Sequence, residues 1–127
     1  MTGALIAGVG CRRDCSAEAI LVLLEQACRE VGRRATVLAT PAFKAGEPGL
    51  QRAARQLGLP VTLVEAGALA EAQARCPTRS PRVLAATGFA SVAEACALAV
   101  AGADGRLVLP RIAGDGATCA LAEVATG

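Results

Sequence analysis

Short apolar runs alternate along this chain with longer segments in which apolar residues recur at helical spacing. The apolar runs predict strands at residues 5–9, 36–39, 61–64 and 83–86. The longer segments predict helices at residues 17–31, 48–57, 68–75 and from Ser91 or its neighbour to Gly102. Strands that alternate with helices in this way are typical of an α/β sheet covered by helices on both faces.

The end of the chain departs from this alternation. Two β-compatible runs at 106–112 and 118–124 flank a turn-rich stretch at 113–117, a pattern that predicts a β-hairpin. A hairpin adds an antiparallel strand at the end of a sheet of parallel strands. We therefore expect a single domain over residues 1–127 with a three-layer α/β/α fold, in which a mixed, mostly parallel sheet ends in an antiparallel hairpin.

Two segments, 4–13 and 83–94, each lead from an apolar strand through glycines toward a helix. The first contains Gly8 and Gly10, and the second contains Gly88. Glycines let backbone N–H groups approach an oxyanion, and helix N-termini favour negative charge. We expect both glycine turns and the loop after the second strand to share one pocket at the edge of the sheet.

Several residues near these turns have a structural interpretation beside a functional one. The first turn, which carries the two guanidinium groups of Arg12 and Arg13, suits a carboxylate or a phosphate, but it also fits a tight turn with solvated arginines. Lys44 and Glu47 form either a ligand-binding lysine oriented by a carboxylate or a surface ion pair. Ser91 and Glu94 match the S-x-x-E capping box, which we favour over direct catalysis.

The composition excludes several classes of protein. At 127 residues and 54% apolar content, the chain can bury a core without metals or crosslinks. Trp and Tyr are absent and Phe43 and Phe89 are the only aromatic residues, which argues against nucleic-acid binding through base stacking. No apolar run approaches the length of about 20 residues that spans a membrane. The net charge of +2 is too small to imply nucleic-acid binding by itself. No leader pattern precedes the first strand, so we expect a cytoplasmic protein.

The absence of histidine narrows the chemistry further. It excludes Ser-His-Asp triads and leaves proton transfer at neutral pH to a perturbed carboxylate, lysine or cysteine. The six cysteines fit buried apolar positions better than a disulfide framework. The C-x3-C spacing of Cys11 and Cys15 is unusual for structural zinc, so we expect no metal and no cofactor. Cys11 is either an ordinary turn residue or a thiol whose pKa a helix N-terminus lowers.

Twelve of the thirteen basic residues are arginine, and Lys44 is the only lysine. This rarity favours a functional interpretation of the lysine, because lysine chemistry can be tuned by burial whereas arginine stays charged. Six arginines outside the motifs are interpreted as solvated surface residues: Arg29, Arg33, Arg34, Arg52, Arg55 and Arg75.

Taken in order along the chain, these motifs resemble the CobE family and the equivalent C-terminal domain of CbiG, proteins of cobalamin (vitamin B12) biosynthesis. The matching pieces are Gly8-Val9-Gly10-Cys11-Arg12, Lys44 with Glu47, Thr87-Gly88 with Ser91-Val92-Ala93-Glu94-Ala95, and Thr118 with Ala120 after Arg111. The family usually has lysine at the position of Arg111, so the positive charge is kept here but amine chemistry is not available.

The resemblance implies a role in building the corrin ring. A precorrin or related corrinoid would be the ligand, and other enzymes of the cobalamin pathway would be partners. CbiG proteins are associated with opening a δ-lactone on such an intermediate and carry an additional N-terminal domain, whereas a domain standing alone resembles CobE of the aerobic route. The ligand-binding residues expected here are Gly8, Gly10, Cys11, Arg12, Lys44, Glu47, Thr87, Gly88, Ser91, Glu94, Arg111 and Thr118.

Three functions stay open at this point. A crevice with Arg12, Lys44 and Arg111 is complementary to the acetate and propionate arms of a corrinoid, which favours a protein that binds a precorrin and hands it on. A second function is a precorrin-modifying hydrolase whose acid, base or nucleophile comes from the lysine, the carboxylates or Cys11. A third is a protein-interaction subunit without a ligand of its own.

Overall fold

The computed structural model describes residues 3–77 and 91–125 of the chain, and within them a single sheet has the strand order β3-β2-β1-β5-β4. The strands β1 (Leu5–Cys11), β2 (Val37–Pro41) and β3 (Val61–Val64) are parallel. The strand β5 (Ala117–Glu123) runs antiparallel to β1 and to β4 (Arg106–Ala113). The predicted mixed sheet that ends in an antiparallel hairpin is confirmed.

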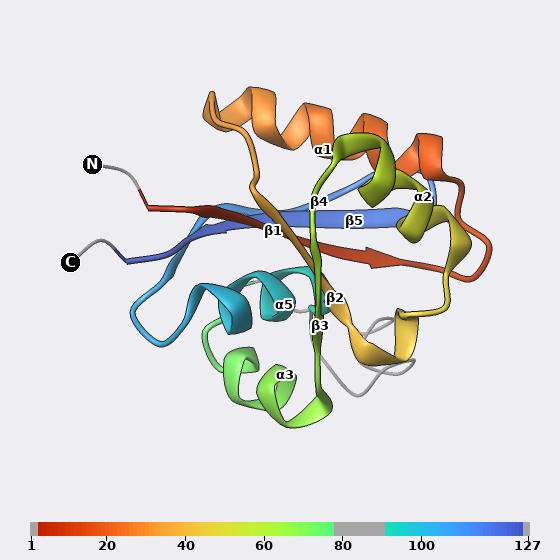
Figure 1. The fold of residues 1–127 in the computed structure, drawn as a ribbon. Helices are drawn as coiled ribbons and strands as arrows, with labels where there is room; N and C mark the ends of the chain where they lie inside the picture. The colour runs from red at the N-terminus through yellow and green to blue at the C-terminus, as the bar shows by residue number, and fades with distance from the viewer. Residues whose placement is uncertain (1–2, 78–90, 126–127) are drawn as a thin grey trace.

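Helices cover both faces of this sheet (Figure 1). The helices α1 (Ala17–Val31) and α2 (Pro48–Leu57) lie on one face, and α3 (Ala66–Gln73) and α5 (Val92–Ala101) lie on the other. In the described part of the chain, no helix has the length and hydrophobicity needed to span a bilayer. The predicted three-layer α/β/α arrangement is confirmed.

The local signals at α1 explain why its predicted bounds agree with the structure. The Ser16 side chain accepts a hydrogen bond from the N–H of Ala19 at 3.1 Å, which satisfies one of the free donors of the first turn. Gly32 ends the helix with a left-handed φ of 69°. The predicted helix at 68–75 instead begins at Ala66, and the predicted strand at 83–86 lies outside the described residues.

The first glycine segment differs from the predicted turn. Strand β1 continues through Cys11, so Gly8 and Gly10 lie inside the strand. A Cβ atom on Gly8 would lie 2.0 Å from the carbonyl oxygen of Ala93 and 2.7 Å from the nitrogen of Ala97. The missing side chain therefore lets the backbone of α5 lie directly on β1. The expectation that Gly8 forms part of an anion-binding turn is wrong, because the glycine serves helix–sheet packing.

The core is aliphatic and divided by the sheet into two layers. Leu5, Leu24 and Leu50 belong to the layer under α1 and α2. Ile6 and Leu98 belong to the layer under α5 and α3. Neighbouring residues of β1 thus point to opposite faces and both are buried, as expected for a central strand of an α/β sheet.

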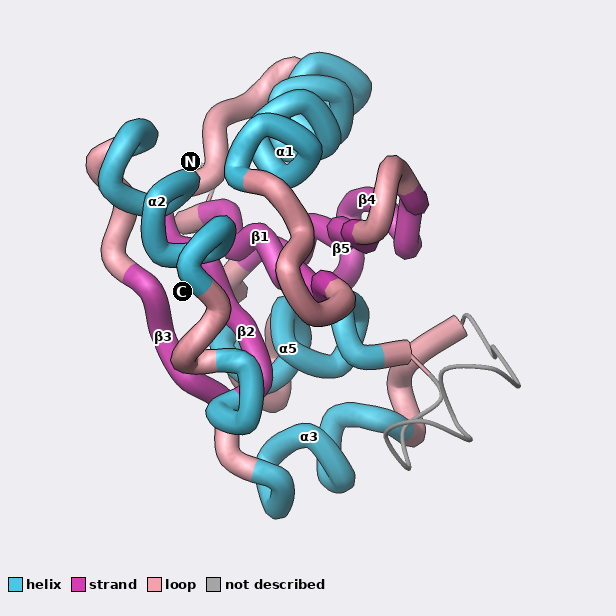
Figure 2. Tube along the Cα trace, turned by 90° about the vertical axis from the view of Figure 1, so that its right-hand side faces the viewer, coloured by secondary structure: helices cyan, strands magenta, loops and turns pink. Residues whose placement is uncertain are grey.

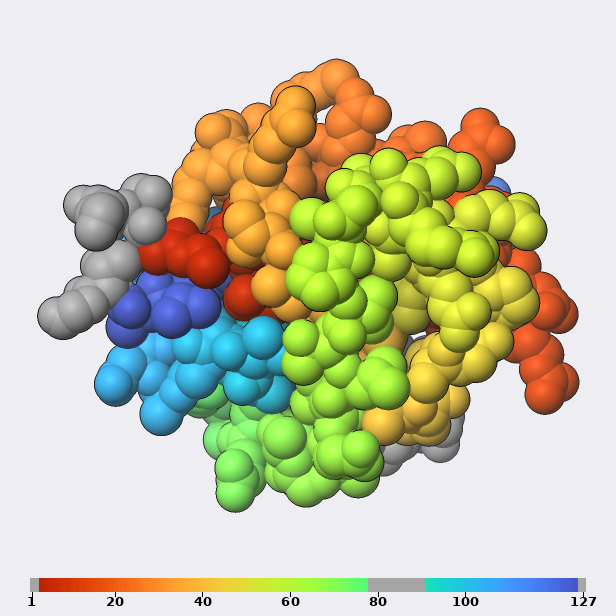
Figure 3. Space-filling model, viewed as in Figure 1, coloured from red at the N-terminus to blue at the C-terminus, as the bar shows by residue number. Residues whose placement is uncertain are grey.

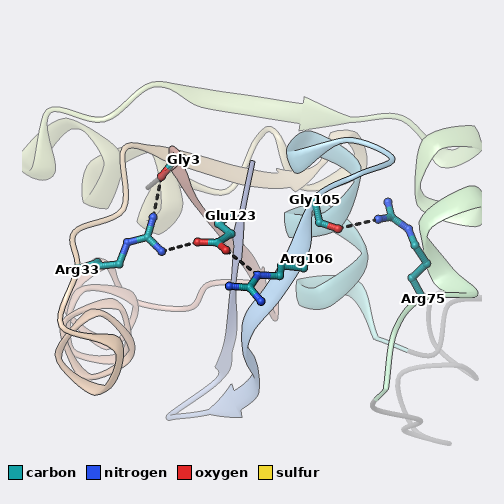
Figure 4. Close-up of polar contacts among 6 residues, drawn as sticks. All are labelled: Gly3, Arg33, Arg75, Gly105, Arg106 and Glu123. Atoms are coloured by element: carbon teal, nitrogen blue, oxygen red, sulfur yellow. Dashed lines mark hydrogen bonds and ion pairs between the residues drawn. The ribbon is translucent and has the colours of Figure 1, made fainter. Parts of the chain in front are cut away.

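Two of the arginines interpreted as solvated surface residues also make structural hydrogen bonds. Arg33 at the end of α1 donates to Glu123 Oε2 at 2.8 Å and to the Gly3 carbonyl at 2.6 Å (Figure 4). Arg106 Nε donates to the other oxygen of Glu123 at 2.6 Å. The Glu123 carboxylate therefore connects β5 with β4, with the start of the chain and with α1.

Arg75 is the second arginine with a structural role. Its guanidinium donates to the carbonyl oxygens of Gly102 at 3.2 Å, Gly105 at 3.3 Å and Leu98 at 3.3 Å (Figure 4). The last carbonyls of a helix have no partner within the helix and favour a cation. Arg75 therefore caps the C-terminal end of α5 from a neighbouring segment.

Strand β3 forms one edge of the sheet, and large apolar side chains are exposed on this strand and at the neighbouring end of α2. The yellow-green segment at the front of Figure 3 contains the end of α2 and β3, where Leu57, Val61 and Leu63 are exposed. Unpaired sheet edges with apolar side chains can pair with another chain. If the protein binds a protein partner, we expect the partner to bind at this edge, because its apolar side chains are exposed.

We expect Glu123→Gln to lower the stability of the fold at neutral pH. Hydrogen bonds from Arg106 and Arg33 lower the pKa of Glu123 below its ordinary value of 4.5. The stability gained from ionising this carboxyl is therefore present above the unfolded pKa and is lost as the pH falls through the lowered folded pKa. Urea unfolding should separate wild type from variant at pH 7, and the difference should vanish in acid. An equal difference at every pH would contradict the role of the ionised carboxylate.

We expect Gly8→Ala to destabilise the protein by about 2 kcal/mol or more, because both atoms that the new methyl would meet belong to the α5 backbone. The matched control is Gly67→Ala in α3, where no atom lies within 4 Å of the added carbon. That control should leave stability unchanged or raise it by up to about 1 kcal/mol. Urea unfolding followed by circular dichroism measures both, and equal effects of the two substitutions would refute the close contact.

Candidate ligand-binding site

An open cavity of about 580 Å³ lies at the end of the sheet where β1 and β2 finish. Figure 2 views the molecule from this end, with the loop between β1 and α1 and the turn between β4 and β5 beside the strand ends. The residues that line the cavity are Gly10, Cys11, Arg12, Arg13, Pro41, Phe43, Lys44, Val92, Arg111, Ala113, Gly114, Asp115, Gly116, Ala117 and Thr118. Ligands of open α/β sheets bind at this edge of the parallel strands.

The cavity brings together half of the residues expected to bind a ligand. Those that line it are Gly10, Cys11, Arg12, Lys44, Arg111 and Thr118. Glu47 and Glu94 do not line the cavity but contact residues around it. Gly8 lies beneath α5 and Ser91 is fully buried at the start of that helix. Thr87 and Gly88 lie outside the described residues.

Gly10 and Thr118 form part of the cavity wall from neighbouring strands. They are paired in the register of β1 and β5, and the Thr118 hydroxyl donates to the Gly10 carbonyl at 3.4 Å. A Cβ on Gly10 would lie 2.8 Å from that hydroxyl oxygen and 3.7 Å from a methyl carbon of Val92. A side chain at Gly10 would therefore crowd this part of the cavity.

Lys44 lies in the cavity wall with Glu47 beside it. The distance from Lys44 Nζ to Glu47 Oε1 is 3.8 Å, and both side chains are largely shielded from solvent. The other oxygen of Glu47 accepts a hydrogen bond from the Asp14 N–H at 3.1 Å. Asp14 has a left-handed φ of 62°, so this contact fixes an unfavourable turn of the β1–α1 loop. Glu47 thus connects the lysine to the loop that carries the two cavity arginines.

The start of α5 does not form the predicted capping box. Ser91 takes the N-cap position, but its side chain makes no capping hydrogen bond, and its hydroxyl has no partner within the described residues. Glu94 is fully buried, and its Oε2 accepts the backbone N–H of Arg111 at 2.9 Å. Glu94 therefore contacts β4 across the layers, an interaction that a local sequence motif does not predict.

The charge of the cavity wall is predominantly positive. Four cationic side chains line it, Arg12, Arg13, Lys44 and Arg111, against the single carboxylate of Asp115. The closest approach of Arg12 to Asp115 is 3.9 Å, with both side chains more than three-quarters exposed, so the pair contributes little. Arg13 and Arg111 form no ion pair with any residue that the structure describes. The wall therefore favours a ligand with several negative charges.

An apolar surface adjoins these cations. Phe43 is 56% exposed, and Pro41, Val92 and Ala117 line the same cavity. Arg13 lies here as the second guanidinium group of the first glycine segment, whereas no motif of the sequence pointed to Phe43, although it directly precedes Lys44. Cationic groups beside an exposed apolar surface suit a ligand that is both anionic and hydrophobic.

Cys11 is the buried last residue of β1, and its chemistry differs from the activated thiol considered above. Burial, and to a smaller extent the neighbouring Cys15, raise the pKa of Cys11 to about 11, and Lys44 only partly opposes them. Of the two interpretations of Cys11, the thiol activated by a helix N-terminus is not supported, because α1 begins several residues later. Among the described residues, no three metal-ligating side chains come together at this or any other place.

Comparison with known proteins identifies the family. Residues 5–122 match the family model of the cobalamin synthesis G C-terminus. The protein CobE of Sinorhizobium sp. is 34% identical over 125 residues, which make up 96% of this chain and 81% of the relative. The chain therefore belongs to the family of the cobalamin synthesis G C-terminal domain, and it is a protein of cobalamin biosynthesis.

Solved structures agree with this assignment. The crystal structure of CobE, a protein from the cobalamin (vitamin B12) biosynthetic pathway, matches with a TM-score of 0.91 and 39% identity, covering 100% of this chain and 94% of that one. The cobalamin biosynthesis protein chiG from Agrobacterium tumefaciens matches with a TM-score of 0.80 and 38% identity, covering 97% and 100%. A cobalamin biosynthesis protein G homologue from Sulfolobus solfataricus has a TM-score of 0.74 but 20% identity, over 97% and 37%, and shows the fold alone.

We expect the thiol of Cys11 to react slowly at neutral pH. With a pKa of about 11 against an ordinary value of 9.0, its thiolate fraction is roughly a hundredfold below that of an unperturbed thiol. Alkylation by iodoacetamide, read at Cys11 by mass spectrometry, should speed up about tenfold per pH unit through pH 10. Protein unfolded in urea at the same pH provides the control and should react at the ordinary rate. Rapid labelling of folded protein at pH 7 would contradict the raised pKa.

Proposed function

We propose that the protein binds a polycarboxylate tetrapyrrole intermediate of cobalamin biosynthesis in the cavity and hands it on unchanged. The observation that carries this proposal is the set of four cations around one cavity, Arg12, Arg13, Lys44 and Arg111, with one carboxylate among them. Precorrin intermediates carry acetate and propionate arms around a macrocycle, so their negative charges are spread over a wide rim. Cations contributed by three separate segments of the chain match such a distribution.

The shape and surface of the cavity support the same ligand class. Its volume of about 580 Å³ lies in the range of about 300–1,000 Å³ that is usual for small-molecule sites. The exposed ring of Phe43 and the side chains of Pro41 and Val92 offer an apolar area on which one face of a macrocycle can rest. An open site of this kind releases its ligand more readily than a deeply enclosed site does, as a protein that hands its ligand on requires.

A modifying enzyme of the δ-lactone-opening kind is less well supported. Such a hydrolysis needs a nucleophile or a general base that reaches the substrate. The Cys11 thiol stays protonated at neutral pH because burial raises its pKa to about 11. Glu94 is fully buried and its carboxylate contacts a backbone N–H. We therefore favour binding over chemistry, and the mass of the bound ligand distinguishes the two.

We expect anaerobic titration with precorrin intermediates to show saturable binding in the visible absorption spectrum of the corrinoid. Replacing Arg12, Lys44 or Arg111 singly by Ala should weaken binding by about 1–2 kcal/mol, roughly five- to thirtyfold, through loss of a charge-assisted contact. Arg52→Ala is the matched control, because Arg52 is exposed on α2 outside the cavity. The affinity should fall as the salt concentration rises.

Two further comparisons test the ligand class. The same macrocycle with its carboxylates converted to methyl esters should bind far more weakly if the cations recognise the carboxylates. The mass of the recovered chromophore should be unchanged if the protein hands the ligand on. A new product mass would make the protein an enzyme, and no binding of any intermediate would refute the proposed site.

A further inference from the structure

Strand β4 carries a β-bulge beside the cavity. Leu109 pairs with Leu121 and Ile112 pairs with Cys119, so two residues of β4, Pro110 and Arg111, stand opposite one residue of β5. Leu109 and Ile112 both pack against the layer under α1, although side chains three residues apart in a regular strand point to opposite faces. The extra residue corrects this alternation, which is how a bulge re-aims the side chains around it.

A buried side chain contacts the backbone of the bulge. Pro110 has no N–H, and the N–H of Arg111 donates to Glu94 Oε2 at 2.9 Å. Glu94 comes from the first turn of α5, on the face of the sheet opposite α1, and is fully buried. A buried carboxyl group is costly unless it is hydrogen-bonded, so its position opposite this N–H fixes both groups.

We infer that Glu94 is a positioning residue, which holds the bulge at Arg111 so that this arginine stays in the wall of the cavity and receives a carboxylate of the ligand. This inference rests on the proposed function and adds to it a residue that does not line the cavity. Arg111 is the only cation of the wall on β4, and no ion pair within the described residues holds its guanidinium. The hydrogen bond from its backbone N–H to Glu94 therefore holds Arg111 in place, as the contact with Glu47 does for Lys44.

The geometry separates a hydrogen-bonding role from a role of charge. Glu94→Gln keeps the length of the side chain and an oxygen that can accept the N–H of Arg111. Glu94→Asp keeps the charge but withdraws the carboxylate by one methylene group. Binding of the precorrin should stay within about twofold of wild type in Glu94→Gln and should weaken about tenfold in Glu94→Asp, close to the effect of Arg111→Ala.

The double variant with Glu94→Asp and Arg111→Ala provides a second measurement, which separates an effect through Arg111 from a general effect on the structure. If Glu94 acts through Arg111, Glu94→Asp should weaken binding no further in the Arg111→Ala background. Hydrogen exchange measured by NMR should show a protected Arg111 amide in wild type and in Glu94→Gln, and faster exchange of this amide in Glu94→Asp. Circular dichroism establishes whether each variant is folded. If Glu94→Asp does not fold, the amide exchange of Arg111 in wild type and in Glu94→Gln provides the test instead.

The outcomes distinguish this inference from the proposed function. Wild-type protein that binds no precorrin would refute the proposed function, and the inference with it. Wild-type binding together with equal affinity in Glu94→Asp would overturn the inference alone, as would an unprotected Arg111 amide in wild type. Retained binding in Glu94→Asp with loss in Glu94→Gln would overturn it too, because charge rather than reach would then matter.

Discussion

The close approach of α5 to β1 is the contact on which the rest of the structure depends. With no side chain at Gly8, the helix backbone lies against the central strand, and α5 packs against all five strands that the structure describes. Small side chains on the helix favour this close approach, and half of its buried residues are alanines. Because α5 lies so close to the sheet, its first turn, with Val92 and Glu94, reaches the end of the sheet where the cavity opens.

Two carboxylates behind the cavity wall, the half-buried Glu47 and the fully buried Glu94, hold parts of that wall in place. Glu47 fixes Lys44 and the β1–α1 loop, while Glu94 fixes the bulge that carries Arg111. In both cases an acidic residue behind the wall supports a basic residue in it. The arrangement keeps the cationic groups ordered without neutralising all of them, which lowers the entropic cost of binding an anion.

Much of the fold could be predicted from the sequence because its signals are local. The bounds of α1 follow from Ser16 and Gly32, and the hairpin follows from two β-compatible runs around a turn. The contacts of Gly8, Glu94 and Arg33 could not be predicted, because each depends on a segment distant in the chain. The motif order indicated the family correctly, and the cationic wall lies where the strand ends were expected to form a crevice.

The antiparallel pairing of β1 with β5 brings the two ends of the described chain together. The N–H of Val124 donates to the Ala4 carbonyl at 2.9 Å, and Figure 1 shows the start of β1 and the end of β5 on the side away from the β1–α1 loop. A fusion partner or affinity label attached at either end would therefore extend away from the cavity. The fold can be inserted into a longer polypeptide in the same way, with the cavity left accessible.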